Sequence, residues 1–122
     1  LKRYADRLFI ISCGTALGVL QKHGIKPDLH ANIERTELPY EVAVKSTSED
    51  FRKGIPFLGA NNNYPPFFEI FGKSAMFLKA GDAGADLFPQ EKLYYVNPTV
   101  TNTGLALAFY LGFRRVYLFG VD

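Results

Sequence analysis

Small and polar residues recur where apolar stretches of this 122-residue chain end, and these side chains are the best suited to bind a ligand. Gly14-Thr15 leads from an apolar stretch into a helical one, where free N–H groups could bind a phosphate. The carboxylate of Glu34 could accept hydrogen bonds from sugar hydroxyls or from a base amino group. The amides of Asn61 and Asn62 can donate and accept, which also suits a base or a sugar. Each position also has a plainer interpretation as a turn, a helix cap or a surface charge.

The C-terminal stretch adds a second group of candidates. Thr99, Thr101 and Asn102 precede an apolar run, where they could present polar groups to a ligand or simply cap a helix. Asp122 follows the last apolar stretch, at residues 116–119. We assign no catalytic residue. The predicted nucleotide- or substrate-binding residues are Gly14, Thr15, Glu34, Asn61, Asn62, Thr99, Thr101, Asn102 and Asp122.

The remaining reactive residue types do not form a recognisable centre. The two histidines, His23 and His30, are far apart, and with the single Cys13 they give no metal-ligand spacing. We interpret His30 as a packed strand residue and Cys13 as a small buried one. The chain also lacks a G-x-G-x-x-G motif and a P-loop. The sequence therefore predicts no metal and no prosthetic group.

Composition restricts the class of protein. With 48% hydrophobic residues, the chain is long enough to form one ordered domain. A net charge of +2 gives no argument for nucleic acid, and no apolar run reaches the roughly 20 residues that span a membrane. One cysteine excludes an internal disulfide and favours a reducing compartment, so we expect a cytoplasmic protein.

Alternating strands and helices must position these candidates. We expect short buried strands at residues 8–12, 29–34, 55–60, 75–79, 93–96 and 116–119. We expect helices at residues 16–23 and 38–45, a short aromatic helix after Pro65-Pro66, and an uncharged helix at 105–111 that is buried nearly all round. Gly24 and Gly112 are predicted helix stops, and residues 48–50 and 81–90 are predicted loops.

This order predicts a three-layer, Rossmann-like α/β fold with a mostly parallel sheet of about five or six strands. Parallel strands end at one edge, which is the usual ligand crevice, so the candidates should gather there. The chain starts at Leu1 without a methionine and stops directly after the last predicted strand. We therefore expect residues 1–122 to be a single partial domain, an excerpt of a larger protein.

Two long motifs resemble the motility-associated factor (Maf) family. LFIISCGTALGVLQKHGIKPDLHANIE is similar to that family's strand, small turn, helix and "GIKPD", followed by a strand that ends in an acid. NPTVTNTGLALAFYLGFRRVYLFGVD is similar to its later threonine- or serine-rich turn, alanine-rich helix and "LxGxD" strand. The two motifs lie at opposite ends of the chain, and together they are fairly specific.

The resemblance implies a sialyltransferase-like domain of a bacterial glycosyltransferase. Maf proteins are thought to transfer nonulosonic acids from CMP-activated donors to flagellin. By position, Gly14 or Thr15, Glu34 and residues 99–101 fall where sialyltransferases contact the nucleotide donor, although those enzymes carry mostly asparagine and serine there. The chain lacks the glycine-proline-serine-rich turn that opens such domains, and the families' candidate catalytic histidine and tyrosines lie beyond the last strand.

The leading hypothesis is part of a glycosyltransferase that moves a nonulosonic, sialic-acid-like sugar from a CMP-activated donor to flagellin Ser/Thr. The expected partners are thus a nucleotide-sugar and flagellin, without nucleic acid or membrane, and a homo-oligomer is compatible with this hypothesis. We expect the 122 residues alone to lack transferase activity. One alternative is an ATP-dependent 6-hydroxymethylpterin diphosphokinase, an activity of an archaeal branch with the same domain. Another is a non-catalytic binding or scaffold fragment.

Overall fold

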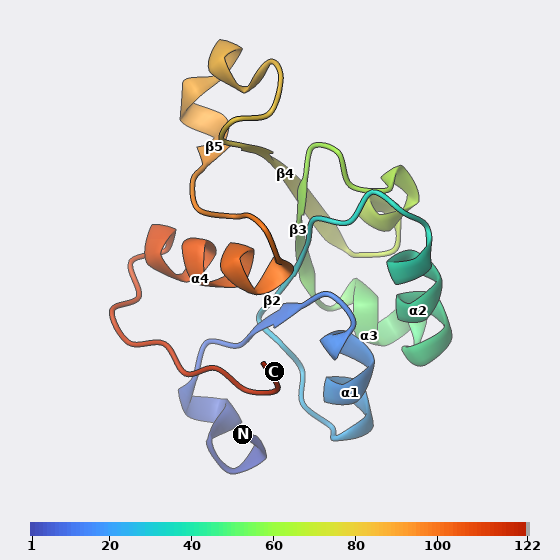
Figure 1. Cartoon of the computed structure of the whole chain (residues 1–122). Helices are drawn as coiled ribbons and strands as arrows, with labels where there is room; N and C mark the ends of the chain where they lie inside the picture. Colours follow the sequence, from blue (N-terminus) through green and yellow to red (C-terminus); the bar gives the residue numbers. More distant parts are fainter. Residues whose placement is uncertain (122) are drawn as a thin grey trace.

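The centre of the molecule is a five-stranded, all-parallel sheet (Figure 1). The structure, a computed structural model, describes residues 1–121. The strands lie in chain order from one edge of the sheet to the other. They are β1 (Ile11–Cys13), β2 (Leu29–Asn32), β3 (Pro56–Ala60), β4 (Lys73–Lys79) and β5 (Lys92–Leu93).

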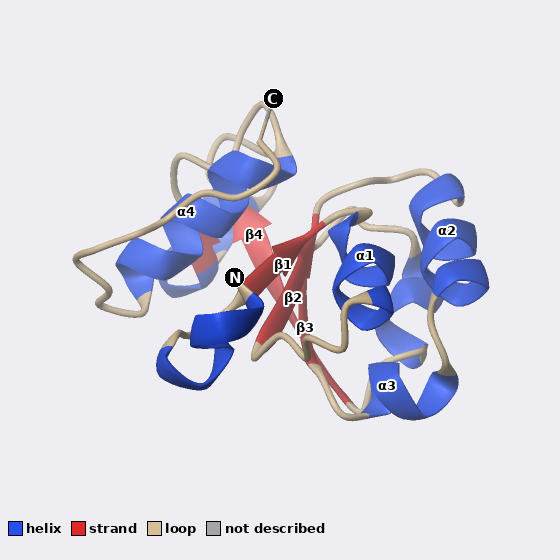
Figure 2. Ribbon diagram, turned by 90° about the horizontal axis from the view of Figure 1, so that it is seen from below, coloured by secondary structure: helices blue, strands red, loops and turns tan. Residues whose placement is uncertain are grey.

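Helices cover both faces of this sheet. The first face carries α1 (Ala16–Lys22), α2 (Leu38–Ser46) and α3 (Glu49–Lys53), whereas α4 (Val100–Tyr110) lies on the second face (Figure 2). The described residues also form four 3-10 helices, namely η1 (Lys2–Arg7), η2 (Pro65–Glu69), η3 (Ala85–Leu87) and η4 (Pro89–Glu91). The predicted three-layer, Rossmann-like α/β fold with a parallel sheet is confirmed.

After β5 the chain returns across the sheet to β1, at the edge of the sheet. The helices that connect β1 to β2 and β2 to β3 pack on the first face, as successive right-handed crossovers require. Helix α4 follows β5 but packs on the second face against β1 and β2. Helices α1 and α4 therefore start from the carboxyl edge of the sheet, where α/β sheets usually bind ligands, and lie on opposite faces of β1.

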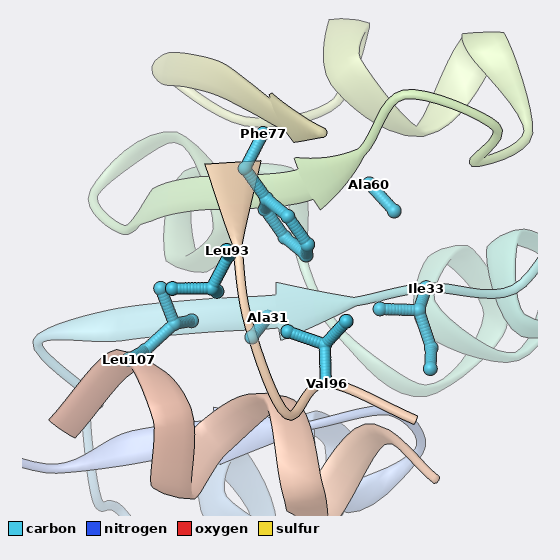
Figure 3. Packing of buried hydrophobic residues seen from close by; sticks show 7 residues of the cluster. All are labelled: Ala31, Ile33, Ala60, Phe77, Leu93, Val96 and Leu107. Atoms are coloured by element: carbon cyan, nitrogen blue, oxygen red, sulfur yellow. The ribbon is translucent and has the colours of Figure 1, made fainter. Parts of the chain in front are cut away.

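Two apolar clusters hold the layers together. The cluster beneath α4 is shown in Figure 3 and consists of Ala31, Ile33, Ala60, Phe77, Leu93, Val96 and Leu107. The cluster on the first face consists of Leu17, Ala43, Ile55, Phe57, Phe67 and Phe71. Strand alternation sends His30 to the aromatic first face and Ala31 to the second.

Both predicted glycine stops end their helices as expected. Gly24 has φ +65°, and the Ile25 N–H donates to the Leu20 carbonyl at 2.9 Å. Gly112 has φ +89°, and the Phe113 N–H donates to the Ala108 carbonyl at 2.9 Å. These bonds satisfy carbonyls that a helix end leaves free, and only glycine adopts this backbone conformation at low cost.

The predicted sixth strand is wrong. Residues 116–119 belong to no strand of the described part of the chain, and all four side chains are exposed. Apolar composition alone does not make a strand, because the backbone must also find a hydrogen-bonding neighbour. The expectation that the last helix is buried all round is wrong too. Only Thr103, Leu107 and Ala108 of α4 are buried, whereas Phe109 and Tyr110 are exposed.

Two shorter segments also differ from the prediction. Residues 48–50 begin helix α3 instead of a loop, with the Ser48 hydroxyl accepting a hydrogen bond from the Phe51 N–H at 3.4 Å. Acidic residues in the first turn favour a helix start as much as a solvated loop, which explains the error. Strand β5 is only Lys92–Leu93, because Tyr95 takes φ +62° and leaves the extended region.

Candidate ligand-binding site

The turn after β1, Gly14-Thr15, lies at the carboxyl edge of the sheet, between β1 and α1. Gly14 has φ +55°, and its N–H donates to the Ala31 carbonyl at 3.1 Å, so the strand ladder sets the position of the turn. A Cβ on Gly14 would lie 3.3 Å from Cγ1 of Val100 at the start of α4. Thr15 is exposed, and its hydroxyl makes no capping hydrogen bond to α1. The Thr15 side chain is thus free to contact a ligand.

The start of α4 faces this turn from the other side. Oδ1 of Asn102 accepts hydrogen bonds from the Thr99 hydroxyl at 2.7 Å and from the Thr99 N–H at 3.4 Å. The Thr103 hydroxyl is buried and donates to the Val96 carbonyl at 3.0 Å. These bonds hold the start of α4 in place, and Thr101 is half-buried in the first turn of this helix. Thr99 and Asn102 therefore act as helix caps, the alternative interpretation of these residues.

Asn32, which was not among the predicted site residues, fixes the backbone at the end of β2. Oδ1 of the buried Asn32 accepts a hydrogen bond from the Glu34 N–H at 2.9 Å. The Glu34 carbonyl accepts one from the Tyr64 N–H at 3.1 Å, in the turn that follows β3. The backbone of Glu34 is thereby fixed while its side chain stays exposed at the carboxyl edge. This arrangement suits a carboxylate that contacts a ligand.

A polar cluster occupies the carboxyl ends of β3 and β4. The Asn61 N–H donates to the Phe77 carbonyl at 2.9 Å, and Asn62 lies between the side chains of Arg35 and Lys79. Nζ of Lys79 also lies 3.6 Å from Oδ2 of Asp82. The predicted binding residues did not include Arg35, Lys79 or Asp82, although Arg35 and Asp82 follow predicted strands in the sequence. The available signal was a lysine that ends an apolar strand, since lysine is almost never fully buried without a partner.

The structure thus gathers the predicted residues at one edge, in two groups. Strand pairing puts the β1 turn next to the end of β2, and the end of β2 next to that of β3. The first group, around β1 and α4, contains Gly14, Thr15, Thr99, Thr101 and Asn102. The second group, at the ends of β2 and β3, contains Glu34, Asn61 and Asn62. The predicted Asp122 lies outside the described residues.

Two side chains of the sheet, Cys13 in β1 and His30 in β2, are uncharged at neutral pH. Burial raises the pKa of the Cys13 thiol to about 11, so it stays protonated. Burial lowers the pKa of His30 to about 3, so the imidazole stays neutral inside the aromatic cluster. Across residues 1–121, no three His, Cys, Asp or Glu side chains gather as metal ligands. Neither Cys13 nor His30 therefore supplies a nucleophile or a base. What the carboxyl edge offers a ligand is its hydrogen-bonding groups and the positive charges of Arg35 and Lys79.

None of the helices in the described chain is both long and apolar enough to cross a membrane.

The fold and this edge define a Rossmann-like α/β domain whose polar groups gather where such domains bind ligands. A family model matches residues 1–122, and the chain belongs to that family, described as 6-hydroxymethylpterin diphosphokinase MptE-like. Among solved structures, the chain is similar to the Maf glycosyltransferase from Magnetospirillum magneticum AMB-1, with 36% sequence identity and a TM-score of 0.89. The match covers 99% of this chain and 20% of that one. No curated protein matches the chain.

Proposed function

We propose that this domain is part of a glycosyltransferase that moves a nonulosonic, sialic-acid-like sugar from a CMP-activated donor to Ser or Thr hydroxyls of flagellin. The observation that carries the proposal is the similarity to the Maf glycosyltransferase over 99% of this chain. The gathering of hydrogen-bonding groups at the carboxyl edge is consistent with a nucleotide-sugar site. A cytoplasmic location belongs to the same proposal.

In this reaction the acceptor oxygen forms a bond to the anomeric carbon while the bond from that carbon to the phosphate oxygen breaks. CMP leaves with the oxygen, and the hydroxyl proton passes to a base. Catalysis therefore requires a base for the acceptor and stabilisation of the departing phosphate. We assign the edge residues to donor binding, with Glu34 on the ribose hydroxyls or the base amino group and Thr15 near the phosphate.

The family description supports a second candidate, an ATP-dependent 6-hydroxymethylpterin diphosphokinase. The two functions need different nucleotides, since one uses a CMP-sugar and the other ATP with magnesium. Calorimetric titration of the intact protein with CMP, and separately with ATP, Mg²⁺ and 6-hydroxymethylpterin, decides between them. Binding of CMP without ATP supports the transferase, and the reverse result supports the kinase.

We expect Glu34→Ala to weaken CMP binding by about 1–3 kcal/mol, the usual loss for a hydrogen bond to a charged group. Thermal unfolding should change little, because the side chain is exposed and only its backbone is held by Asn32 and Tyr64. Glu69→Ala removes another exposed carboxylate, on η2, and is the matched control. Equal CMP affinity in the wild type and both variants would leave Glu34 as a surface charge.

A further inference from the structure

The polar cluster after β3 and β4 is built around one amide. When Oδ1 of Asn62 points toward the two cations, it accepts hydrogen bonds from Nε and Nη2 of Arg35 at 3.1 and 3.2 Å. In the same orientation it accepts one from Nζ of Lys79 at 3.0 Å. The opposite orientation leaves a single 3.4 Å contact from Nδ2 to Asp82. The first orientation satisfies more donors, so Asn62 holds a guanidinium and an ammonium side by side.

This pair of cations is poorly neutralised. The Lys79 side chain is only 8% exposed, and its carboxylate partner, Asp82, lies at the long distance of 3.6 Å. Arg35 is exposed and makes no ion pair within residues 1–121, and the neighbouring Glu34 pairs with neither cation there. Two positive charges share this one carboxylate, and the burial of Lys79 makes its field stronger than that of a surface charge. The cluster is thus suited to attract an anion.

Unpartnered amides surround the same turn. Nδ2 of Asn32 and both amide atoms of Asn63 are buried without a hydrogen-bond partner among the described residues, as is Oδ1 of Asn61. Unsatisfied buried groups of this kind cost stability unless a water molecule or a ligand satisfies them. The two Nδ2 groups are donors, which is the type of group that an oxyanion requires.

We propose that Arg35 and Lys79, held by Asn62, form the binding site for an oxyanion of the substrate. Arg35 makes the surface contact, because its planar guanidinium can donate two parallel hydrogen bonds to a phosphate or a carboxylate. Lys79 adds charge from beneath, and Asn62 is a positioning residue. This assignment rests on the proposed transferase, whose donor carries two such groups, the phosphate of CMP and the carboxylate of the nonulosonic sugar.

Calorimetry on the intact protein with four probes separates these two sources. Cytidine carries neither anion, CMP carries the phosphate, the free nonulosonic acid carries the carboxylate, and the CMP-nonulosonate carries both. If the site binds phosphate, Lys79→Met and Arg35→Gln weaken CMP binding by about ten- to a hundredfold and leave cytidine binding unchanged. If it binds the carboxylate, both variants keep CMP affinity and lose affinity for the free acid and for the CMP-nonulosonate.

Matched controls come from the same chain. Lys73 starts β4 at the opposite end from Lys79 and is exposed, so Lys73→Met removes one positive charge away from the carboxyl edge. Arg114→Gln does the same for an exposed arginine after α4. Thermal unfolding reports whether Lys79→Met folds, and Arg35→Gln, at an exposed side chain, tests the site independently of that result. Asn62→Ala should weaken anion binding less than either cation variant.

The outcomes separate the site from the proposed function. Unchanged affinities in both cation variants, in a protein that binds CMP, overturn the oxyanion site and leave the transferase standing. A wild type that binds neither CMP nor the CMP-nonulosonate overturns the transferase, and inorganic pyrophosphate then tests the site. Pyrophosphate binding that Lys79→Met and Arg35→Gln abolish sustains the site. If the wild type does not bind pyrophosphate, or if both variants bind it as the wild type does, the oxyanion site is overturned.

Discussion

At the scale of single residues, His30 shows how burial makes stability depend on pH. Its ring stacks against Phe57, Phe67 and Phe71 at centroid distances of 5.8, 6.0 and 5.3 Å. Nδ1 lies 2.9 Å from the Ser12 hydroxyl oxygen, and Nε2 has no partner among the described residues. Burial lowers the pKa of His30 to about 3, because the aromatic surroundings do not solvate an imidazolium. The folded protein therefore holds this imidazole neutral.

This predicts a loss of stability in acid. Between about pH 6.5 and pH 3 the unfolded chain binds a proton at His30 that the folded chain does not. The free energy of unfolding should then fall by about 1.4 kcal/mol per pH unit as the pH drops through this range, and be unaffected by His30 above it. Urea unfolding at several pH values should show a correspondingly shallower decline for His30→Phe. The control is His23→Gln, at an exposed histidine after α1, and equal slopes in all three proteins would contradict the assignment.

At the scale of elements, the contact between α4 and β1 depends on a glycine. A Cβ on Gly104 would lie 2.6 Å from Sγ of Cys13, so helix and strand touch with no space for a methyl group. Gly104→Ala should raise helix propensity by about 1 kcal/mol, yet overpacking of this kind costs about 1–3 kcal/mol. We expect a net loss of stability in chemical unfolding, because the neighbouring atom lies within the sheet.

A second substitution tests the cause of that loss. Cys13→Ala removes the sulfur atom, so the double variant with Gly104→Ala should regain much of the stability that Gly104→Ala loses. Additive effects of the two substitutions would show that the helix glycine is needed for another reason. The same contact positions the start of α4, so Gly104→Ala should also weaken the proposed nucleotide binding at the Gly14–Thr15 turn, which lies against Val100.

The elements that the sequence predicted well are those with local signals. Helix α1 follows from its apolar face and from Gly24, which supplies a left-handed residue that other types adopt only at a cost. The strand at residues 116–119 was mispredicted because apolar residues indicate burial but not which edge pairs with them. Asn61 and Asn62 could be expected at the carboxyl edge because they directly follow a strand. The role of Lys79 could not be predicted, because Asn62 and Lys79 come together only when β3 pairs with β4.

At the scale of the whole molecule, the two faces of the sheet are covered unequally. Three helices and η2 cover the first face, whereas the second carries α4, which packs mainly against β1 and β2 (Figure 2). A hollow of about 380 Å³ opens beside α4 over β3 and β4, lined mainly by apolar side chains that include Leu58, Met76 and Tyr110. Met76 is 56% exposed. Exposed apolar surface of this kind attracts small apolar molecules.

We therefore expect the 122-residue chain to enhance the fluorescence of a hydrophobic dye such as anilinonaphthalene sulfonate while it is folded. Met76→Lys should reduce this enhancement several-fold, because a charged side chain enters the hollow, with an effect on stability within about 0.5 kcal/mol at this exposed position. Val44→Lys changes an exposed apolar residue on α2, on the covered first face, and should leave dye binding as it is. Equal dye fluorescence in Met76→Lys and the wild type would show that the dye does not bind in this hollow. A loss of fluorescence confined to Val44→Lys would place the dye on the first face.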